Sequence, residues 1–348
     1  MKIGIIGLGR VYKHYEKNFI PSLLKDDHSL YLFDSNIGKM DSLKITYNCK
    51  KLLSINEIIA NKVDFAIIAT PSGSHYEITK RLLSNGINVL TEKPATMTEY
   101  ELSELISLAE KASLKYGVIF QNRLNPAIKI VKRLVDNNHL GDVKICSIKL
   151  HWCRFQNYYD DDWHGTWKMD GGVINQQAIH HLDAMQWING PFYSVVASAS
   201  NQINKLEAED TMMALVKFRS GSVGTIEAST AIRPVDKEAS IFISGTYGFI
   251  KVGGIALNKI NDFNLRGLDK STETLLSKAS INVDSGYGTS HKEVIYDFIK
   301  SIQLDRAPII PASSVIETVR SVHSLYKSAE TNSWINLEKN ISSSRLGK

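Results

Sequence analysis

The fold of the first half of the chain is decided by one stretch near its start, Ile3-Gly4-Ile5-Ile6-Gly7-Leu8-Gly9-Arg10-Val11-Tyr12. An apolar strand ends here and a helix begins. Gly7 permits a tight turn, and Gly9 lets the backbone approach a pyrophosphate whose charge the helix N-terminus stabilises. Tyr12 stands where a third glycine or an alanine is usual, a departure that concerns helix packing and not the phosphate contact. The stretch predicts a dinucleotide site formed by Gly7, Gly9, Arg10 and Val11.

A carboxylate supports this prediction. Asp34 ends the second predicted strand, at the distance from the glycine loop where an acidic side chain accepts the ribose hydroxyls. It would repel a 2'-phosphate, and no Arg or Lys immediately follows it. We therefore predict a Rossmann domain that binds NAD rather than NADP.

Strand and helix patterns divide the chain into two domains. Residues 1–122 alternate short apolar runs with helical stretches, which is typical of a parallel sheet. From about residue 140 the strand patterns follow one another with few helices, which is typical of an antiparallel sheet. The predicted fold class is α/β: an N-terminal Rossmann parallel sheet in residues 1–122, then a second α+β domain on a mostly antiparallel open sheet in residues 123–348. The predicted strands are Lys2–Ile6, Leu30–Phe33, Phe65–Ala69, Asn88–Leu90, Val118–Phe120, Val143–Trp152, Ser194–Ile203, Met212–Phe218, Ser222–Thr230 and Ala239–Ser244.

Composition excludes several classes of protein. The 348 residues are 43% hydrophobic with a net charge of +5, and the basic residues are not clustered, so we expect no nucleic-acid partner. No apolar run approaches the roughly 20 residues that span a bilayer, and the N-terminus lacks a signal-peptide layout, so we expect a cytoplasmic protein without membrane contact. The three cysteines form no C-x-x-C pair, and no metal site is expected.

Three further motifs carry a family resemblance. They are Ala69-Thr70-Pro71-Ser72-Gly73-Ser74-His75, then Thr91-Glu92-Lys93-Pro94, and finally Gly171-Gly172-Val173-Ile174-Asn175-Gln176-Gln177-Ala178-Ile179-His180-His181-Leu182-Asp183. Together they resemble the Gfo/Idh/MocA oxidoreductases over nearly the whole chain. The resemblance implies a cofactor contact for Thr70, Pro71, His75, Glu92 and Lys93, and a cis peptide bond before Pro94. It also implies that Lys93 reaches the substrate and that His180 faces Lys93 from the second domain.

The chemistry of alcohol oxidation is consistent with these roles. The hydroxyl proton must leave while hydride leaves the carbon, and a histidine base such as His180 suits that task near neutral pH. A lysine ammonium such as Lys93 stabilises the developing alkoxide. Gln176 stands where many family members carry Asp, and an amide can only hydrogen-bond, so we expect no Asp–His relay.

An aromatic segment before His180 indicates the substrate. It contains Trp-x-Arg, Tyr-Tyr and Trp-x-Gly-Thr-Trp patterns. These patterns resemble the branch of the family that oxidises UDP-N-acetylglucosamine or its uronate at C3. The product of that reaction is a 3-keto sugar for surface-glycan biosynthesis. The predicted substrate contacts are Arg123, Arg154, Tyr158, Tyr159, Trp163, Trp167 and Gln176. Arg123 equally suits an interdomain salt bridge, and His291 either reaches the sugar or is structural.

Two other functions remain open. The first is a dehydrogenase of a free sugar or of an inositol-like cyclitol, and the second is a non-catalytic, NAD-sensing regulator on the same fold. The antiparallel sheet offers a broad face, from which we expect a homodimer or homotetramer.

Overall fold

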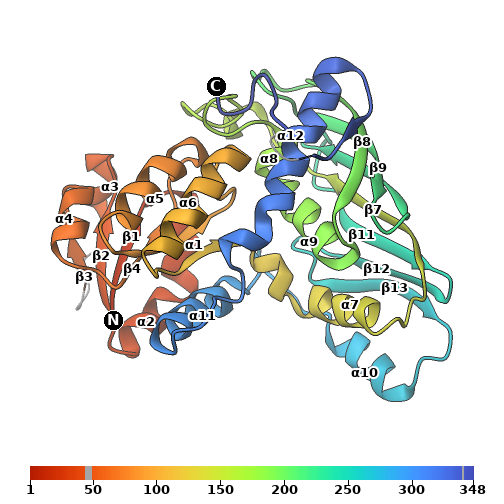
Figure 1. Ribbon diagram of the computed structural model, residues 1–348, viewed down its shortest axis with the longest axis horizontal. Helices are drawn as coiled ribbons and strands as arrows, with labels where there is room; N and C mark the ends of the chain where they lie inside the picture. The colour runs from red at the N-terminus through yellow and green to blue at the C-terminus, as the bar shows by residue number, and fades with distance from the viewer. Residues whose placement is uncertain (44–48, 339–340) are drawn as a thin grey trace. The chain divides into compact units, whose positions relative to one another are not determined.

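The structure is a computed structural model that describes residues 1–43, 49–338 and 341–348 (Figure 1). These residues form two compact units, and each is described by itself. Unit 1 comprises Met1–Ile119 and His291–Ile316. Unit 2 comprises Phe120–Ser290 and Glu317–Lys348.

Unit 1 is built on a parallel sheet, whose described strands run in the order β3-β2-β1-β4-β5-β6. The strands are β1 (Lys2–Ile6), β2 (Ser29–Phe33), β3 (Cys49–Lys51), β4 (Phe65–Ile68), β5 (Asn88–Glu92) and β6 (Tyr116–Ile119). The helices are α1 (Arg10–Asn18), α2 (Ile20–Lys25), α3 (Ile37–Ser42), α4 (Ile55–Ala60), α5 (His75–Leu83), α6 (Glu99–Lys111) and α11 (His291–Gln303), with short 3₁₀ turns η1 (Ser72–Ser74) and η4 (Ala312–Val315). The strand order reverses between β1 and β4, so the glycine loop after β1 lies at the switch point where such sheets bind ligands.

The core of unit 1 explains why these strands form. Every residue of β4 is fully buried, as expected for a parallel strand covered on both faces. Helix α11 returns late in the chain and packs on this sheet, with the Phe298 ring 5.3 Å from that of Phe65 and its edge close to Gly117. Because of this packing, residues 291–316 cluster with unit 1, whereas the boundary predicted at residue 122 assigns them to the second domain.

Unit 2 is built on a sheet whose described strands run in the order β13-β12-β11-β7-β10-β9-β8-β14. Strands β7 and β10 pair in parallel, and the other neighbours pair antiparallel. The strands are β7 (Val143–His151), β8 (Phe192–Ser200), β9 (Thr211–Phe218), β10 (Val223–Ser229), β11 (Glu238–Gly245), β12 (Gly248–Gly253), β13 (Lys259–Leu265) and β14 (Ile335–Asn336). The helices are α7 (Pro126–Asp136), α8 (Val173–Gln176), α9 (Ile179–Asn189), α10 (Lys270–Lys278) and α12 (Ile316–Thr331), with 3₁₀ turns η2 (Gln121–Leu124) and η3 (Gln156–Tyr158).

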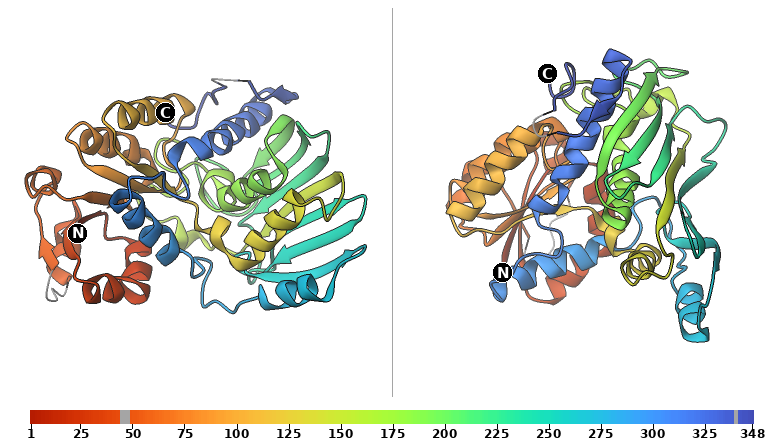
Figure 2. Two further views of the ribbon diagram at one scale, coloured as in Figure 1. Left: turned by 60° about the horizontal axis from the view of Figure 1, so that its bottom comes forward. Right: turned by 45° about the vertical axis from the view of Figure 1, so that its right-hand side comes forward.

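One face of this sheet is covered by helices. Helices α7 and α9 lie against it, as the left view of Figure 2 shows. Side chains along β9 alternate accordingly: Met212 and Val216 are buried, whereas Met213 and Leu215 are exposed. Alternation of this kind is typical of an antiparallel sheet that has one helix-covered face.

The predicted fold class is confirmed, since a parallel sheet is followed by a mostly antiparallel one. The predicted strands lie within a few residues of those observed, and the predictions omitted β3, β12, β13 and β14. The segment around His180 forms two helices, α8 and α9, which are separated at Gln177 and Ala178. Among the described residues, no helix combines the length and apolar character needed to cross a membrane.

Candidate functional site

The glycine loop of unit 1 connects β1 to α1, and its two glycines have different surroundings. Gly7 has a φ of +97°, and a Cβ added there would come within 2.5 Å of the carbonyl group of Ala69. Gly9 is the N-cap of α1, and a Cβ added there would meet no described atom within 4 Å. The space at Gly9 is therefore open to a ligand beside a helix N-terminus, which favours an anion such as a pyrophosphate.

This difference predicts two outcomes for alanine. Gly9→Ala is expected to weaken NAD binding about 10- to 100-fold, because its methyl group occupies space that the pyrophosphate needs. The melting temperature should stay near that of the wild type. Gly7→Ala is the matched control and should unfold at a markedly lower temperature, because its methyl group meets backbone. Calorimetric titration and thermal unfolding measure both effects, and an unchanged Kd in Gly9→Ala would contradict close approach of the cofactor.

Tyr12, at the third position of the glycine pattern, is 5% exposed within α1. Burial, together with the nearby Glu16 and Cys49, raises the pKa of the Tyr12 hydroxyl. Arg10 and Val11 open the same helix, the first exposed and the second half-buried. The buried face of α1 thus accommodates a large side chain, and the strand–turn–helix unit forms without the third glycine.

Asp34 follows β2 and lies beside the glycine loop. Its Oδ2 accepts the Leu8 N–H at 2.7 Å, and its Oδ1 accepts the Asn36 N–H at 2.8 Å. The carboxylate is therefore held where the sequence predicts the ribose site, and these residues fit NAD. Lys39 also contacts Oδ2, at 3.3 Å, and sequence reasoning missed it because it considered only the residues directly after Asp34. The available signal was helix spacing, since Asn36 caps α3 and Lys39 is its third residue.

The turn after β4 contains three of the predicted cofactor residues. Thr70 and Pro71 are partly exposed there. His75 is 0% exposed, with Nδ1 2.7 Å from the Pro94 carbonyl oxygen and Nε2 2.9 Å from the Thr70 carbonyl oxygen. Burial lowers the pKa of His75. His75 thus joins the turns that follow β4 and β5, and its predicted cofactor contact stays a prediction.

Lys93 directly follows β5 and is half-buried, and its peptide bond to Pro94 is cis, as predicted. The carboxylate of Glu92 is buried and accepts a hydrogen bond from the Tyr15 hydroxyl. Nε2 of His291 lies 3.6 Å from the same carboxylate. Of the two roles left open for His291, the structure therefore shows a contact inside unit 1.

In unit 2, His180 is the second residue of α9 and is half-buried, with the ring of Phe120 edge-on at 5.8 Å. Its neighbour His181 is buried, and burial lowers the pKa of His181 to about 3. Gln176 ends α8, and its Nε2 donates to the Tyr158 hydroxyl at 3.2 Å. Across the described parts of the chain, no group of three or more His, Cys, Asp or Glu side chains is arranged to hold a metal ion.

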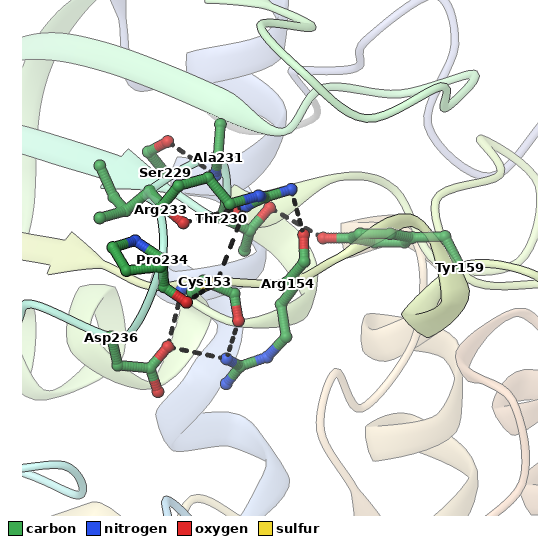
Figure 3. Close-up of polar contacts among 10 residues, drawn as sticks. Cys153, Arg154, Tyr159, Ser229, Thr230, Ala231, Arg233, Pro234 and Asp236 are labelled. Atoms are coloured by element: carbon green, nitrogen blue, oxygen red, sulfur yellow. Dashed lines mark hydrogen bonds and ion pairs between the residues drawn. The ribbon is translucent and has the colours of Figure 1, made fainter.

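Arg154 connects several predicted substrate residues, and Figure 3 shows its polar contacts. Its guanidinium lies over the rings of Trp152 and Tyr158, at 4.7 and 5.7 Å from their centroids. Its Nη1 donates to Asp236 Oδ1 at 2.9 Å. Since Gln176 donates to Tyr158, these contacts bring three predicted residues together. We call this set the Arg154 cluster: Trp152, Arg154, Tyr158, Gln176 and Asp236.

Arg233, which sequence reasoning did not single out, supports this cluster. Its Nη2 donates to the Arg154 carbonyl oxygen at 2.9 Å, and its Nη1 donates to the Thr230 carbonyl oxygen at 3.2 Å (Figure 3). Tyr159 is 8% exposed, and its hydroxyl lies 2.8 Å from Thr230 Oγ1. Tyr159 thus supports the loop from a buried position, and its substrate contact stays a prediction. No local sequence pattern marks Arg233.

The two tryptophans later in the aromatic segment have other partners. The ring of Trp163 stacks on that of His164 at 3.6 Å. Trp167 contacts the ring of Tyr326 at 5.2 Å and lines a cavity of about 330 Å³ together with Glu209. Burial raises the pKa of Glu209 to about 8. The ring of His164 also lies 4.9 Å from that of Tyr158 in the Arg154 cluster. The substrate role of Trp163 and Trp167 stays a prediction.

Arg123 forms a buried ion pair within unit 2. Its Nε and Nη2 donate to the two carboxylate oxygens of Asp183 at 2.7 and 2.6 Å. The Thr318 hydroxyl donates to the same carboxylate at 2.9 Å. Of the two roles left open for Arg123, the structure shows an ion pair, although with a residue of its own unit, and anion binding stays a prediction.

Comparison with known proteins adds three relatives. Residues 1–120 match the family model described as oxidoreductase family, NAD-binding Rossmann fold, and residues 132–337 match its C-terminal alpha/beta domain. An uncharacterized oxidoreductase of Synechocystis is 30% identical over 193 residues, which cover 51% of this chain and only 50% of that protein. UDP-N-acetylglucosamine 3-dehydrogenase of Acidithiobacillus ferrooxidans is 23% identical over 258 residues. The aligned region covers 72% of this chain and 74% of that protein. The crystal structure of the WlbA dehydrogenase from Bordetella pertussis with NADH and UDP-GlcNAcA is similar at a TM-score of 0.89 and 26% identity, over 98% of both chains.

Proposed function

Because this chain belongs to the Gfo/Idh/MocA oxidoreductase family, we propose that it oxidises a ring hydroxyl of a nucleotide sugar. It is an NAD-dependent oxidoreductase acting on CH–OH groups. The proposed substrate is a UDP-N-acetylhexosamine or its uronate, oxidised at C3 to a 3-keto sugar for surface-glycan biosynthesis. The observation that carries this proposal is the likeness, over 98% of both chains, to WlbA with NADH and UDP-GlcNAcA.

The Arg154 cluster supports an anionic, sugar-bearing substrate. A guanidinium stacked on two aromatic rings keeps its planar donor edge aligned, and such an edge binds phosphate or carboxylate oxygens well. Sugars pack against aromatic faces such as those of Trp152 and Tyr158. The side chain of Arg154 is 24% exposed, so part of it can meet a ligand, although Asp236 competes for the same donors.

Each unit supplies one proposed catalytic side chain. Bound NAD supplies the hydride acceptor. The Lys93 ammonium stabilises the negative charge that develops on the substrate oxygen, and the His180 imidazole takes the hydroxyl proton. Gln176 holds Tyr158 by a hydrogen bond and does not act as a general acid or base, since a neutral amide does not titrate near neutral pH.

A substrate panel tests the proposal. We expect NADH to form with UDP-GlcNAc or its uronate at a kcat/KM at least about 100-fold above that for free GlcNAc, glucose or inositol, because buried polar groups left unpaired disfavour truncated substrates. Reduction of the product with borodeuteride should place deuterium at C3. Turnover of a free sugar or cyclitol in preference to the nucleotide sugars would overturn the proposal. The protein would then be a dehydrogenase of a free sugar or of an inositol-like cyclitol.

Association between copies of the chain belongs to the same proposal. The face of the unit 2 sheet opposite α7 and α9 exposes Met213 and Leu215 on β9, Val223 on β10 and Ile145 on β7. Val223 pairs directly with Ile145, so these side chains come from adjoining strands. Exposed apolar side chains grouped in this way support a homodimer or homotetramer in a cytoplasmic enzyme.

A further inference from the structure

A buried carboxylate lies next to the proposed catalytic lysine. Glu92 ends β5, is 7% exposed and immediately precedes Lys93. Its Oε2 accepts the Lys93 backbone N–H at 3.3 Å. An isolated buried carboxylate is unfavourable, so such a group persists only where other side chains hold it.

Two helices from distant parts of the sequence hold this carboxylate. Tyr15, in the helix that begins at the glycine loop, is fully buried and donates its hydroxyl hydrogen to Glu92 Oε1. His291, the first residue of α11, is 2% exposed and places Nε2 3.6 Å from the same oxygen. The rings of Tyr15 and His291 also contact each other, at 5.7 Å between centroids. Both contacts therefore converge on one oxygen, while the other oxygen accepts the Lys93 backbone N–H.

The charges around the carboxylate favour its ionised form. Contacts with His291, Tyr15 and Lys93 outweigh burial and lower the pKa of Glu92. His14 lies 4.9 Å from the His291 ring, and its own pKa is lowered to about 4 by burial and by His291. At neutral pH the cluster thus presents a carboxylate to the lysine that the proposed reaction uses.

We propose that Tyr15 and His291 are positioning residues, which fix the Glu92 carboxylate and through it the orientation and charge of Lys93. This inference rests on the role of Lys93 in the proposed function. Neither side chain needs to touch substrate or cofactor. Helix α1 begins at the glycine loop and contains Tyr15. The same helix therefore borders the proposed cofactor site and, through Glu92, positions Lys93.

Four variants test the inference. Tyr15→Phe removes one oxygen atom, His291→Leu removes the ring nitrogens, and Glu92→Gln keeps the shape but removes the charge. Tyr296→Phe is the matched control, because it removes the contact between α11 and Asp26, at 2.5 Å, without affecting Glu92. We expect the first three to lower kcat about 10- to 100-fold, the effect of losing a hydrogen bond to a charged group, with KM for NAD nearly unchanged. Tyr296→Phe should resemble the wild type.

A second readout needs no substrate. The rate at which acetic anhydride labels Lys93, followed by mass spectrometry across pH, reports the titration of its amine. The labelling midpoint should move to lower pH in Glu92→Gln, because the negative charge that favours the ammonium form is then gone, and it should stay constant in Tyr296→Phe. This readout keeps its meaning if the nucleotide sugars prove not to be substrates.

The outcomes distinguish positioning from general structural support. Tyr15→Phe and Glu92→Gln combined should cost less than the sum of their separate effects, because both act through one contact. Strictly additive effects, or a labelling midpoint equal to that of the wild type in folded Glu92→Gln, would overturn the inference. If His291→Leu does not fold, His291→Gln, which keeps a donor, takes its place and should retain more activity than Glu92→Gln.

Discussion

Replacement of Lys93 by alanine is expected to lower kcat for the nucleotide sugar by about 1,000-fold. A donor aimed at a developing oxyanion contributes roughly 100- to 1,000-fold to kcat, and a charged donor lies at the upper end of that range. Lys93 stands at the end of β5 and is half-buried, so water replaces its ammonium poorly. The Kd for NAD should change only a few-fold, since Gly9 and Asp34 remain in place. Stopped-flow measurement of NADH formation under single-turnover conditions checks the effect on the chemical step.

The control for this variant is a lysine elsewhere in unit 1. Lys80 in α5 forms a surface ion pair with Glu104, and its replacement by alanine removes the same charge away from the proposed site. Lys80→Ala should leave kcat and the Kd for NAD unchanged. If Lys93→Ala retained the turnover of the wild type, Lys93 would have no catalytic role. If no oxidation of any substrate were found in either protein, the NAD-sensing regulator would become the better explanation.

Local sequence patterns were sufficient for most of unit 1. Strand β1 is predicted with its observed bounds, because an apolar run and Gly7 mark its end. Strand β3 has only three residues with little alternation, which is too short for a periodic signal. Strand β13 was missed because most of its side chains are exposed or half-buried, so the apolar alternation that marks a strand is weak.

The site was predicted less completely, because its contacts join distant parts of the chain. The family motif identifies Glu92 and Lys93, but nothing near His291 in the sequence shows that it reaches the Glu92 carboxylate. Likewise, Arg154 is recognisable beside aromatic residues, whereas Asp236 and Arg233 become its partners only because the segment between β10 and β11 runs beside the chain that follows β7. Sequence reasoning thus identified residue types that suit the chemistry. The tertiary structure shows which of these side chains hydrogen-bond or pack against one another.

The largest effect on stability is expected from the Arg123–Asp183 pair. Asp183→Ala should lower the free energy of unfolding by about 3–5 kcal/mol, because it leaves the Arg123 guanidinium buried without its carboxylate. The side chains are 7% and 2% exposed, so water cannot replace the lost partner. Thr318 loses its acceptor as well. Urea denaturation followed by the fluorescence of the five tryptophans, all of which lie in unit 2, measures the change.

Two comparisons make this prediction specific. Asp136→Ala removes a carboxylate from the Lys132–Asp136 pair on α7, which is half-exposed, and should cost less than about 1 kcal/mol. Replacing both partners by apolar residues, Arg123→Met with Asp183→Leu, should recover much of the stability lost in Asp183→Ala, because no buried charge then lacks a partner. Equal effects of Asp183→Ala and Asp136→Ala would contradict the buried geometry. Since His180 lies one helical turn before Asp183 in α9, a stable double variant with low kcat would show that the ion pair also orients the proposed base.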